Sequence, residues 1–425
     1  MKAVLLLSNG HGEDLSAAAV GRHLQDRGIA VEALPLVGLG QAYRQAGIPV
    51  LGPTRDFTTG GLGYTSLAAR LTDLREGQFT YVLRLLGRLR RRRRQTRLVV
   101  AVGDLVPVLG AWLSGCNAVV YLVAYSSHYE GRLRLPWPCG WLLRRPRVAA
   151  VWSRDQLTAH DLSGQLGRPV RFLGNPFLDS LLTPLGGPGH AEPATPPPAQ
   201  HRQAVAVLPG SRLPEALGNL ALQLQVLARL PATTAGRPAP LLQAALVGSL
   251  EPEAIAAMAA PLGWRLEASG ESPPTPSAAK LVLVRGEQHL ELHWGAFAAV
   301  LARSDLVLSM GGTASEQAVA LAKPVLQLAG PGPQFTAGFA EAQRRLLGPG
   351  VVCAAGAVGE ASTLAATAGL MVEMLEQLGD PAAGPRWRRE LEGIAAERLG
   401  EAGGGARMAA AIMEVLEAQP AARSR

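Results

Sequence analysis

A short glycine turn is the first feature of this sequence that could do chemistry. It follows an apolar run at residues 306–308, which is typical of a buried parallel strand, and it precedes a helix expected over residues 316–321. Glycines let the backbone turn tightly and approach a ligand, and the free amides at the start of a helix favour a diphosphate. The residues of this candidate donor turn are Gly311, Gly312, Thr313 and Ala314.

Other side chains in the same half could hold the remaining parts of a nucleotide sugar. Glu316 would repel a phosphate, but its carboxylate could accept hydrogen bonds from the 2′- and 3′-hydroxyls of a ribose. Ser211 and Arg212 follow a strand expected at 204–208, and a guanidinium pairs with a diphosphate in bidentate geometry. Gln334 could bond sugar hydroxyls, although a plain turn explains its glycine- and proline-rich segment as well.

Two candidates for proton transfer occur in the first half. Asp104 follows an apolar strand expected at 98–102, and ligands of doubly wound sheets lie beyond the carboxyl ends of strands. Its carboxylate could therefore take the proton of an attacking hydroxyl, and a turn or cap role is the alternative. His11, in a glycine loop, is the other candidate base. The acceptor-side residues of that loop are Gly10, Gly12 and Glu13, although the helix dipole also explains an acidic residue there.

Strand and helix signals alternate along both halves of the chain, which predicts an α/β protein with two doubly wound, Rossmann-like domains. The first domain is expected over residues 1–182 and the second over 204–384, joined by a linker rich in proline and glycine at 183–203. Further local expectations are a helix over 14–27, a helix over 294–301, a loop over the alanine- and glycine-rich residues 354–369, and terminal helices within 385–425.

Four segments, in this order along the chain, resemble the lipid-A-disaccharide synthase-like glycosyltransferases. They are Ser8-Asn9-Gly10-His11-Gly12-Glu13-Asp14, Phe172-Leu173-Gly174-Asn175-Pro176 with Asp179, Leu208-Pro209-Gly210-Ser211-Arg212 with Glu215, and the donor turn. The family usually has histidine where Asn175 stands. The resemblance implies a GT-B fold, in which two Rossmann-like domains face a cleft, the second domain holds the donor, and the terminal helices pack back on the first. It also implies that Asp104 is the base.

The resemblance further implies a hexosyltransferase that moves a sugar of the N-acetylglucosamine type from a UDP-sugar to a lipid-linked acceptor, as in lipid A biosynthesis. A nucleotide-sugar 2-epimerase or hydrolase would share the donor site, and a non-catalytic membrane-binding protein would share the fold. No metal or other cofactor is expected, because helix N-termini and Arg212 can stabilise the leaving diphosphate.

The basic residues are concentrated in one segment. Residues 84–97 contain eight arginines and no acidic residue, and these eight equal the formal net charge of +8. Apolar residues such as Tyr64, Leu67 and Leu71 lie upstream, a combination that suits the surface of an anionic bilayer. A solvated helix end is the alternative, and no nucleic acid partner is expected because interleaved stacking aromatics are missing. The candidate membrane-surface residues are Arg84, Arg88, Arg90, Arg91, Arg92, Arg93 and Arg94.

Length and composition are consistent with two domains in the cytoplasm. The chain has 425 residues, of which 48% are hydrophobic, but no apolar run approaches the ~20 residues of a membrane span. The apolar run at residues 3–7 is too short for a signal peptide, and three distant cysteines indicate neither a disulfide framework nor a metal knuckle. We therefore expect a cytoplasmic protein associated peripherally with the inner face of the membrane.

Overall fold

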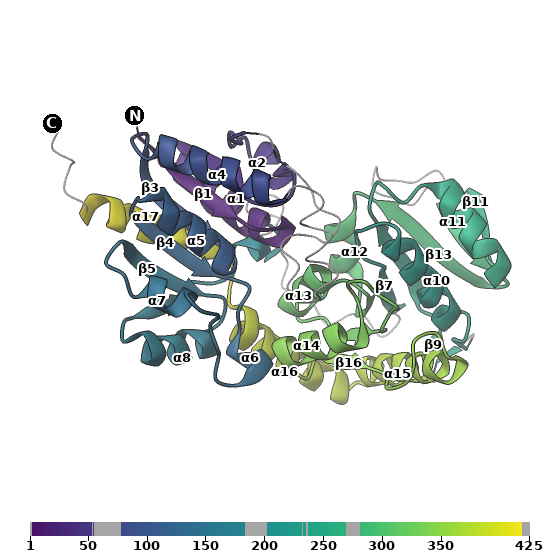
Figure 1. Cartoon of the computed structure of the whole chain (residues 1–425). Helices are drawn as coiled ribbons and strands as arrows, with labels where there is room; N and C mark the ends of the chain where they lie inside the picture. Colours follow the sequence, from purple (N-terminus) through teal and green to yellow (C-terminus); the bar gives the residue numbers. More distant parts are fainter. Residues whose placement is uncertain are drawn as a thin grey trace. The chain divides into compact units, whose positions relative to one another are not determined.

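The computed structural model describes residues 2–52, 54, 78–182, 202–231, 233–234, 237–268 and 281–418. The chain divides into two compact units, of which unit 1 comprises Met1–Thr183 and Leu399–Arg425, and unit 2 comprises Pro184–Arg398 (Figure 1). The expected terminal segment 385–425 is thus shared between the units. The expected linker at 183–203 lies almost wholly outside the described residues.

Unit 1 is built on a six-stranded, fully parallel sheet in the order β2-β1-β3-β4-β5-β6. Its strands are rich in valine, leucine and alanine on both faces, as expected where helices cover both sides of a parallel sheet. The strands are β1 (Ala3–Ser8), β2 (Val31–Pro35), β3 (Thr96–Val102), β4 (Ala118–Leu122), β5 (Val148–Ser153) and β6 (Val170–Phe172).

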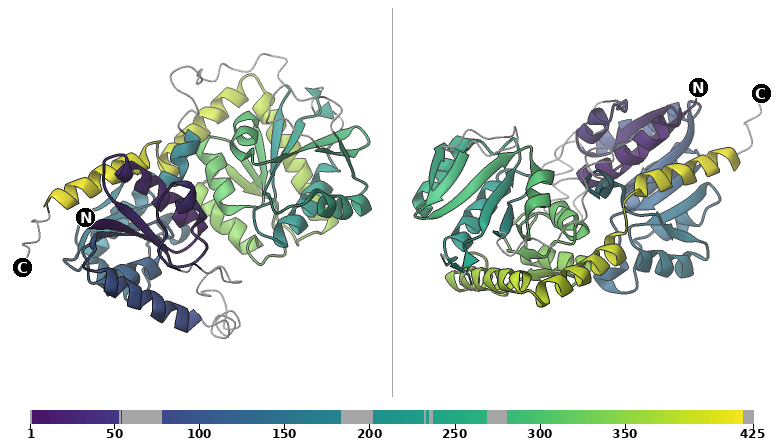
Figure 2. Two further views of the ribbon diagram at one scale, coloured as in Figure 1. Left: turned by 90° about the horizontal axis from the view of Figure 1, so that it is seen from above. Right: turned by 180° about the vertical axis from the view of Figure 1, so that it is seen from behind.

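Two separate apolar clusters place the helices of unit 1 on the two faces of this sheet. One face packs against α1 (His11–Gln25), α2 (Gln41–Gln45) and α17 (Gly404–Ala418), and the rear view in Figure 2 shows α17 across that face. The opposite face packs against α4 (Gln78–Arg92), α5 (Leu105–Ser114), α7 (Cys139–Leu143) and α8 (Gln156–Leu166). The short elements α6 (Ser127–Glu130), η1 (Pro176–Leu178) and α9 (Asp179–Leu182) complete the unit.

Unit 2 contains an eight-stranded sheet in the order β11-β12-β13-β10-β7-β14-β15-β16. In this sheet β12 alone runs in the direction opposite to the other strands. The strands are β7 (Ala204–Leu208), β10 (Leu241–Leu246), β11 (Arg265–Ala268), β12 (Leu281–Arg285), β13 (Gln288–Trp294), β14 (Leu306–Ser309), β15 (Val325–Gln327) and β16 (Val351–Cys353), with a separate ribbon of β8 (Thr233–Thr234) and β9 (Arg237–Pro238). The helices are α10 (Glu215–Leu227), α11 (Pro252–Ala259), η2 (Ala260–Leu262), α12 (Phe297–Arg303), α13 (Gly312–Ala320), α14 (Ala337–Leu347), α15 (Ala361–Gly379) and α16 (Ala383–Leu399).

Two expectations for the second half have the wrong bounds. The helix expected over 294–301 begins only at Phe297, because Trp294 ends β13, which pairs antiparallel with β12. The loop expected over 354–369 is largely helical, since α15 spans Ala361–Gly379. Alanine is the best helix former, and the buried residues of α15 recur at helical spacing, so composition was misleading there. The buried residues that show this spacing are Leu364, Ala368, Met371 and Leu375.

The segment that resembles the family's interdomain element anchors the C-terminal helix of unit 1. The carboxylate of Asp179 accepts hydrogen bonds from the amides of Gly403, Gly404 and Gly405 at the start of α17, at 2.9, 3.0 and 2.7 Å. The start of α17 lies close to the segment at Asn175, because a Cβ on Gly404 would lie 2.9 Å from the amide nitrogen of Asn175.

Among the helices of the described residues, none combines the length and apolarity needed to cross a bilayer.

We predict that Asp179→Ala lowers the free energy of unfolding of unit 1 by about 2 kcal/mol, because three helix N-terminal amides lose a charged acceptor. The measurement is urea unfolding followed by circular dichroism, together with limited proteolysis ahead of α17. Asp179→Asn keeps one carbonyl acceptor and should show a smaller loss. Equal stability of Asp179→Ala and wild type would contradict this capping role.

Candidate functional site

The donor turn joins β14 to α13, and the ring of Phe339 lies against Gly312, where a Cβ would be 3.0 Å from it. β14 ends at Ser309, and α13 begins at Gly312, four residues earlier than expected from the sequence. Gly311 is the N-cap and has no side chain with which to cap the helix, while the Ser315 hydroxyl turns inward and donates to the carbonyl of Gly311 at 2.7 Å. Thr313 is exposed, and Glu316 lies half-buried on the first turns of the helix.

A second glycine turn touches the first. β7 and β14 are neighbouring parallel strands, and Leu208 pairs with Ser309 at their carboxyl ends. A Cβ on Gly210 would lie 3.2 Å from the carbonyl oxygen of Met310, so these turns pack backbone against backbone. Gly210 has a φ of 102°, which is accessible to glycine and strained for other residues. Ser211 and Arg212 follow it and are exposed at the same sheet edge.

The segment after β15 is fastened to this edge by Glu215. Its carboxylate accepts hydrogen bonds from the amides of Gln334 at 3.0 Å and Phe335 at 2.7 Å. Gln334 therefore lies close to the first turn of α10, with its side chain exposed. The structure thus brings together three turns that the sequence analysis treated one by one.

Two buried amides hold these turns in place, and the sequence analysis missed both. Gln223 donates from Nε2 to the carbonyls of Leu208 at 3.2 Å and Leu308 at 3.1 Å, which belong to the two neighbouring strands. Asn219 donates to the carbonyl of Pro209 at 2.9 Å. Their spacing of four residues on an otherwise apolar helix face is the signal that could have indicated a shared structural role.

In unit 1, Asp104 lies at the carboxyl end of β3 and caps α5. Its Oδ1 accepts from the amide of Val106 at 2.8 Å, and Asn9 donates to both carboxylate oxygens at 3.2 and 3.3 Å. The cap role that was the alternative for Asp104 is therefore present. Burial is the largest influence on the carboxyl group and raises its pKa, while these hydrogen bonds oppose the increase. A raised pKa makes a carboxylate a stronger base.

Glu13 brings a second carboxylate to the same edge. A Cβ on Gly10 would lie 2.7 Å from Oε2 of Glu13, and a Cβ on Gly103 would lie 3.3 Å from its Cγ. The side chain therefore lies across two glycine positions, one of them adjacent to Asp104.

α1 begins at His11 rather than at residue 14, because the glycine at position 10 turns the chain directly into the helix with a φ of 152°. Gly12 is consequently helical, and the side chain of His11 lies outside the described part of the structure.

A buried hydroxyl relay lies beneath this edge and was not expected from the sequence. Ser8 donates to Oδ1 of Asp14 at 2.5 Å, so the Tyr43 hydroxyl, 2.5 Å away, must donate to Ser8. Ser8 and Tyr43 are fully buried and Asp14 is 3% exposed. Burial raises the pKa of Asp14 from 3.8 to about 7, against a smaller opposing effect of the Ser8 hydrogen bond.

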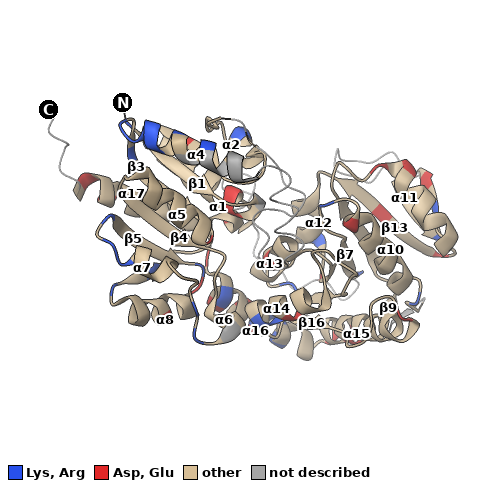
Figure 3. Ribbon diagram, in the orientation of Figure 1, with Lys and Arg blue, Asp and Glu red and all other residues tan. Residues whose placement is uncertain are grey.

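The arginine-rich segment forms the C-terminal half of α4 and the turn after it (Figure 3). Arg92 pairs with Glu32 of β2, whereas Arg84, Arg90, Arg91, Arg93 and Arg94 are exposed and Arg88 is half-buried. The upstream residues Tyr64, Leu67 and Leu71 lie outside the described residues.

Solved structures that resemble this chain share its architecture over almost the whole length. The S. aureus MnaA–UDP co-structure has a TM-score of 0.57 at 13% sequence identity, covering 100% of this chain and 99% of that chain. A UDP-N-acetylglucosamine 2-epimerase has a TM-score of 0.54 at 14% identity, with the same coverage of 100% and 99%. The calicheamicin glycosyltransferase CalG4 has a TM-score of 0.52 at 19% identity, covering 99% and 100%.

The chain has a GT-B fold. This confirms the expectation of two Rossmann-like domains. No protein-family model matches the sequence, and neither does any curated protein sequence. The GT-B likeness, at these low identities, establishes architecture and leaves the resemblance to lipid-A-disaccharide synthases as a proposal about function.

We predict that the stability of unit 1 falls as the pH rises through about 7, because Asp14 binds its proton more tightly in the folded state. The contribution is fully present below a pH of about 4 and amounts to up to about 4 kcal/mol. Asp14→Asn should flatten this dependence and be more stable than wild type at pH ~8. The measurement is urea unfolding across this pH range.

Asp26→Asn, at an exposed position just after α1, is the matched control and should leave the pH profile unchanged. Parallel profiles for wild type and Asp14→Asn would contradict the buried, proton-binding state of Asp14.

Proposed function

We propose that this GT-B protein is an enzyme that binds a UDP-sugar through unit 2 and breaks the bond between the anomeric carbon and the diphosphate. The observation that carries the proposal is the contact between the glycine turns after β7 and β14. That contact places the uncapped start of α13 beside the exposed Arg212. A diphosphate would accept from the helix amides and pair with the guanidinium, which together stabilise the charge of the leaving group.

The ribose and the sugar would be held by the neighbouring polar side chains. Glu316 follows the anion-binding amides on the same helix, where its carboxylate would accept from the ribose hydroxyls instead of facing the phosphates. Gln334 lies in the segment fastened by Glu215 and would bond sugar hydroxyls. This arrangement requires no metal ion for the departure of UDP.

Unit 1 would supply the groups that transfer protons. Asp104 and Glu13 lie around Gly103 at the carboxyl edge of the sheet, and burial raises the pKa of Asp104. Two carboxyl groups in different surroundings can divide the roles of acid and base. Asp104 is the proposed base and His11 the alternative.

The first candidate reaction uses the UDP-sugar alone. Epimerisation at C2 would remove a proton from that carbon as UDP leaves C1, and a proton would return to the opposite face of C2 as UDP adds back to C1. Hydrolysis would replace UDP with water. The structural likeness to a UDP-N-acetylglucosamine 2-epimerase and to MnaA bound to UDP supports this class.

The second candidate reaction is transfer of an N-acetylglucosamine-type sugar to a lipid-linked acceptor at the cytoplasmic face of the membrane. Here the base would take the proton of the acceptor hydroxyl as its oxygen attacks the anomeric carbon. The arginine-rich end of α4 favours this reaction, because it suits an anionic bilayer. The likeness to CalG4 and the motifs shared with lipid-A-disaccharide synthases support transfer as the chemistry.

We predict that Glu316→Ala weakens UDP binding about tenfold to a hundredfold, since a charged acceptor for the ribose hydroxyls is lost. Isothermal titration calorimetry with UDP measures the effect. Glu253→Ala, which removes an exposed carboxylate from α11, is the control and should bind as wild type does. Unchanged affinity in Glu316→Ala would remove the ribose role.

We predict that Asp104→Asn retains UDP binding and loses turnover by about a hundredfold or more, because asparagine still caps α5 but cannot accept a proton. Turnover is followed by liquid chromatography that separates the C2 epimers, coupled to mass spectrometry, after incubation with UDP-N-acetylglucosamine, with and without a membrane lipid extract. Product from the nucleotide sugar alone would identify the first candidate reaction, and a glycolipid the second. Full activity of Asp104→Asn would exclude Asp104 as the base.

A further inference from the structure

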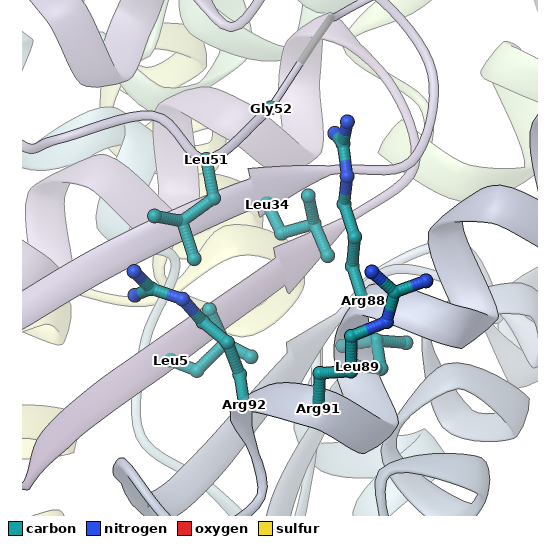
Figure 4. Close-up of a pocket in the computed structure, with 8 residues that line it drawn as sticks. All are labelled: Leu5, Leu34, Leu51, Gly52, Arg88, Leu89, Arg91 and Arg92. Carbon is teal, nitrogen blue, oxygen red and sulfur yellow. The ribbon is translucent and has the colours of Figure 1, made fainter.

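A cavity of about 250 Å³ lies at the lateral edge of the unit 1 sheet, between β2 and α4 (Figure 4). Leu5 of β1, Leu34 of β2 and Leu89 of α4 form its buried floor, and the half-buried Leu51 forms one wall. Because these side chains offer no polar partner, water gains little by filling such a floor, and hydrocarbon suits it better.

Three guanidinium groups surround the same cavity. Arg88, Arg91 and Arg92 belong to one side of α4, and Figure 4 shows their side chains around the leucines. Arg92 is neutralised by Glu32. Among the described residues, no acidic side chain forms an ion pair with Arg88 or Arg91, so no described carboxylate neutralises these two guanidinium groups at the rim.

The backbone beside the cavity is shaped to leave the rim open. Gly52 has a φ of 78°, and a Cβ there would collide with the guanidinium of Arg88. A side chain at this position would displace that charge from the rim. Glycine at position 52 therefore keeps Arg88 over the cavity.

The surface around α4 is also cationic and aromatic. Arg93 lies against Gly115 at the end of α5, and on that helix Trp112 packs edge-on against Trp141, with ring centroids 5.6 Å apart. Arg147 and Arg145 stack on these two rings at 3.9 and 3.6 Å from the ring centroids. Trp141 is 46% exposed. Indole rings with basic residues are typical of proteins at the headgroup level of a bilayer.

We propose that the cavity between β2 and α4 binds an anionic lipid, with its phosphate on Arg88 and Arg91 and the start of an acyl chain along the leucines. A free phosphate would gain nothing from the apolar floor, and a nucleic acid would not reach it. The cavity shares no residue with the proposed catalytic edge, so this lipid is an anchor and the inference does not depend on the proposed function.

The ligand is tested by calorimetry on the full chain with dodecyl phosphate, kept below its micelle concentration, and with inorganic phosphate. Saturable binding of dodecyl phosphate together with much weaker binding of inorganic phosphate is expected. Equal affinity for the two probes, or no saturable binding of dodecyl phosphate, would overturn the proposal.

The site is tested with two variants of equal charge. The double variant Arg88→Ala with Arg91→Ala removes two guanidinium groups from the rim of the cavity. The double variant Arg90→Ala with Arg94→Ala removes two arginines that do not line the cavity. At about 1 kcal/mol for each basic residue, the first pair should weaken dodecyl phosphate binding about thirtyfold. The second pair should change it little. Equal losses would show a diffuse charge effect and refute a built site.

A third variant tests the apolar part without changing charge. Leu51→Trp should fill the cavity and weaken binding both to dodecyl phosphate and to vesicles of phosphatidylcholine mixed with phosphatidylglycerol. Vesicles of phosphatidylcholine alone should bind neither wild type nor variant. Thermal unfolding shows whether the variant is folded. If it is not folded, binding of dodecyl phosphate by the two arginine double variants tests the proposal instead. Unchanged binding by folded Leu51→Trp would overturn the proposal.

Discussion

The carbonyl groups at the ends of β7 and β14 impose the constraint on which the proposed nucleotide site depends. These carbonyls are buried and can take a further donor beyond the sheet: that of Leu208 already accepts from the backbone amide of Met310 at 2.8 Å. The side-chain amide of Gln223 supplies one to each strand, and Asn219 supplies the turn that follows. Glycines at 210 and 311 can then bring the two turns into contact beside the start of α13, which has no side-chain cap.

Unit 1 follows the same principle with different chemistry. Its strands also end at glycine turns, but carboxylates rather than amides occupy the edge. Asp104 is partly committed to the start of α5, and Glu13 lies over the glycine positions beside it. The relay of Tyr43, Ser8 and Asp14 lies below them and is closed to solvent. Burial therefore separates the relay from the two half-buried carboxylates at the edge.

The polar groups at these two sheet edges could serve more than one reaction, so the fold alone does not determine the reaction. Solved structures of a UDP-N-acetylglucosamine 2-epimerase and of a glycosyltransferase both resemble this chain, so proteins of both kinds share its architecture. Under the proposed function, the fate of the sugar would depend on whether water, a carbon-bound proton or an acceptor hydroxyl meets the base. The proposed contact of lipid with the basic, aromatic side of α4 and α5 would be compatible with either reaction.

Local patterns were sufficient to predict much of this protein. The alternation of apolar runs and helices indicated two doubly wound sheets, and the glycine turns and the arginines of α4 could be read directly, because each depends on neighbours in the chain. Composition failed at α15, where alanine was taken for loop. Only the tertiary structure decided that α13 begins at Gly312, that Ser8 meets Tyr43, and that Asp179 holds α17. The start of α13 follows from hydrogen bonds within its own turn, whereas the other two outcomes rest on hydrogen bonds and burial between distant segments, for which the sequence carries no periodic signal.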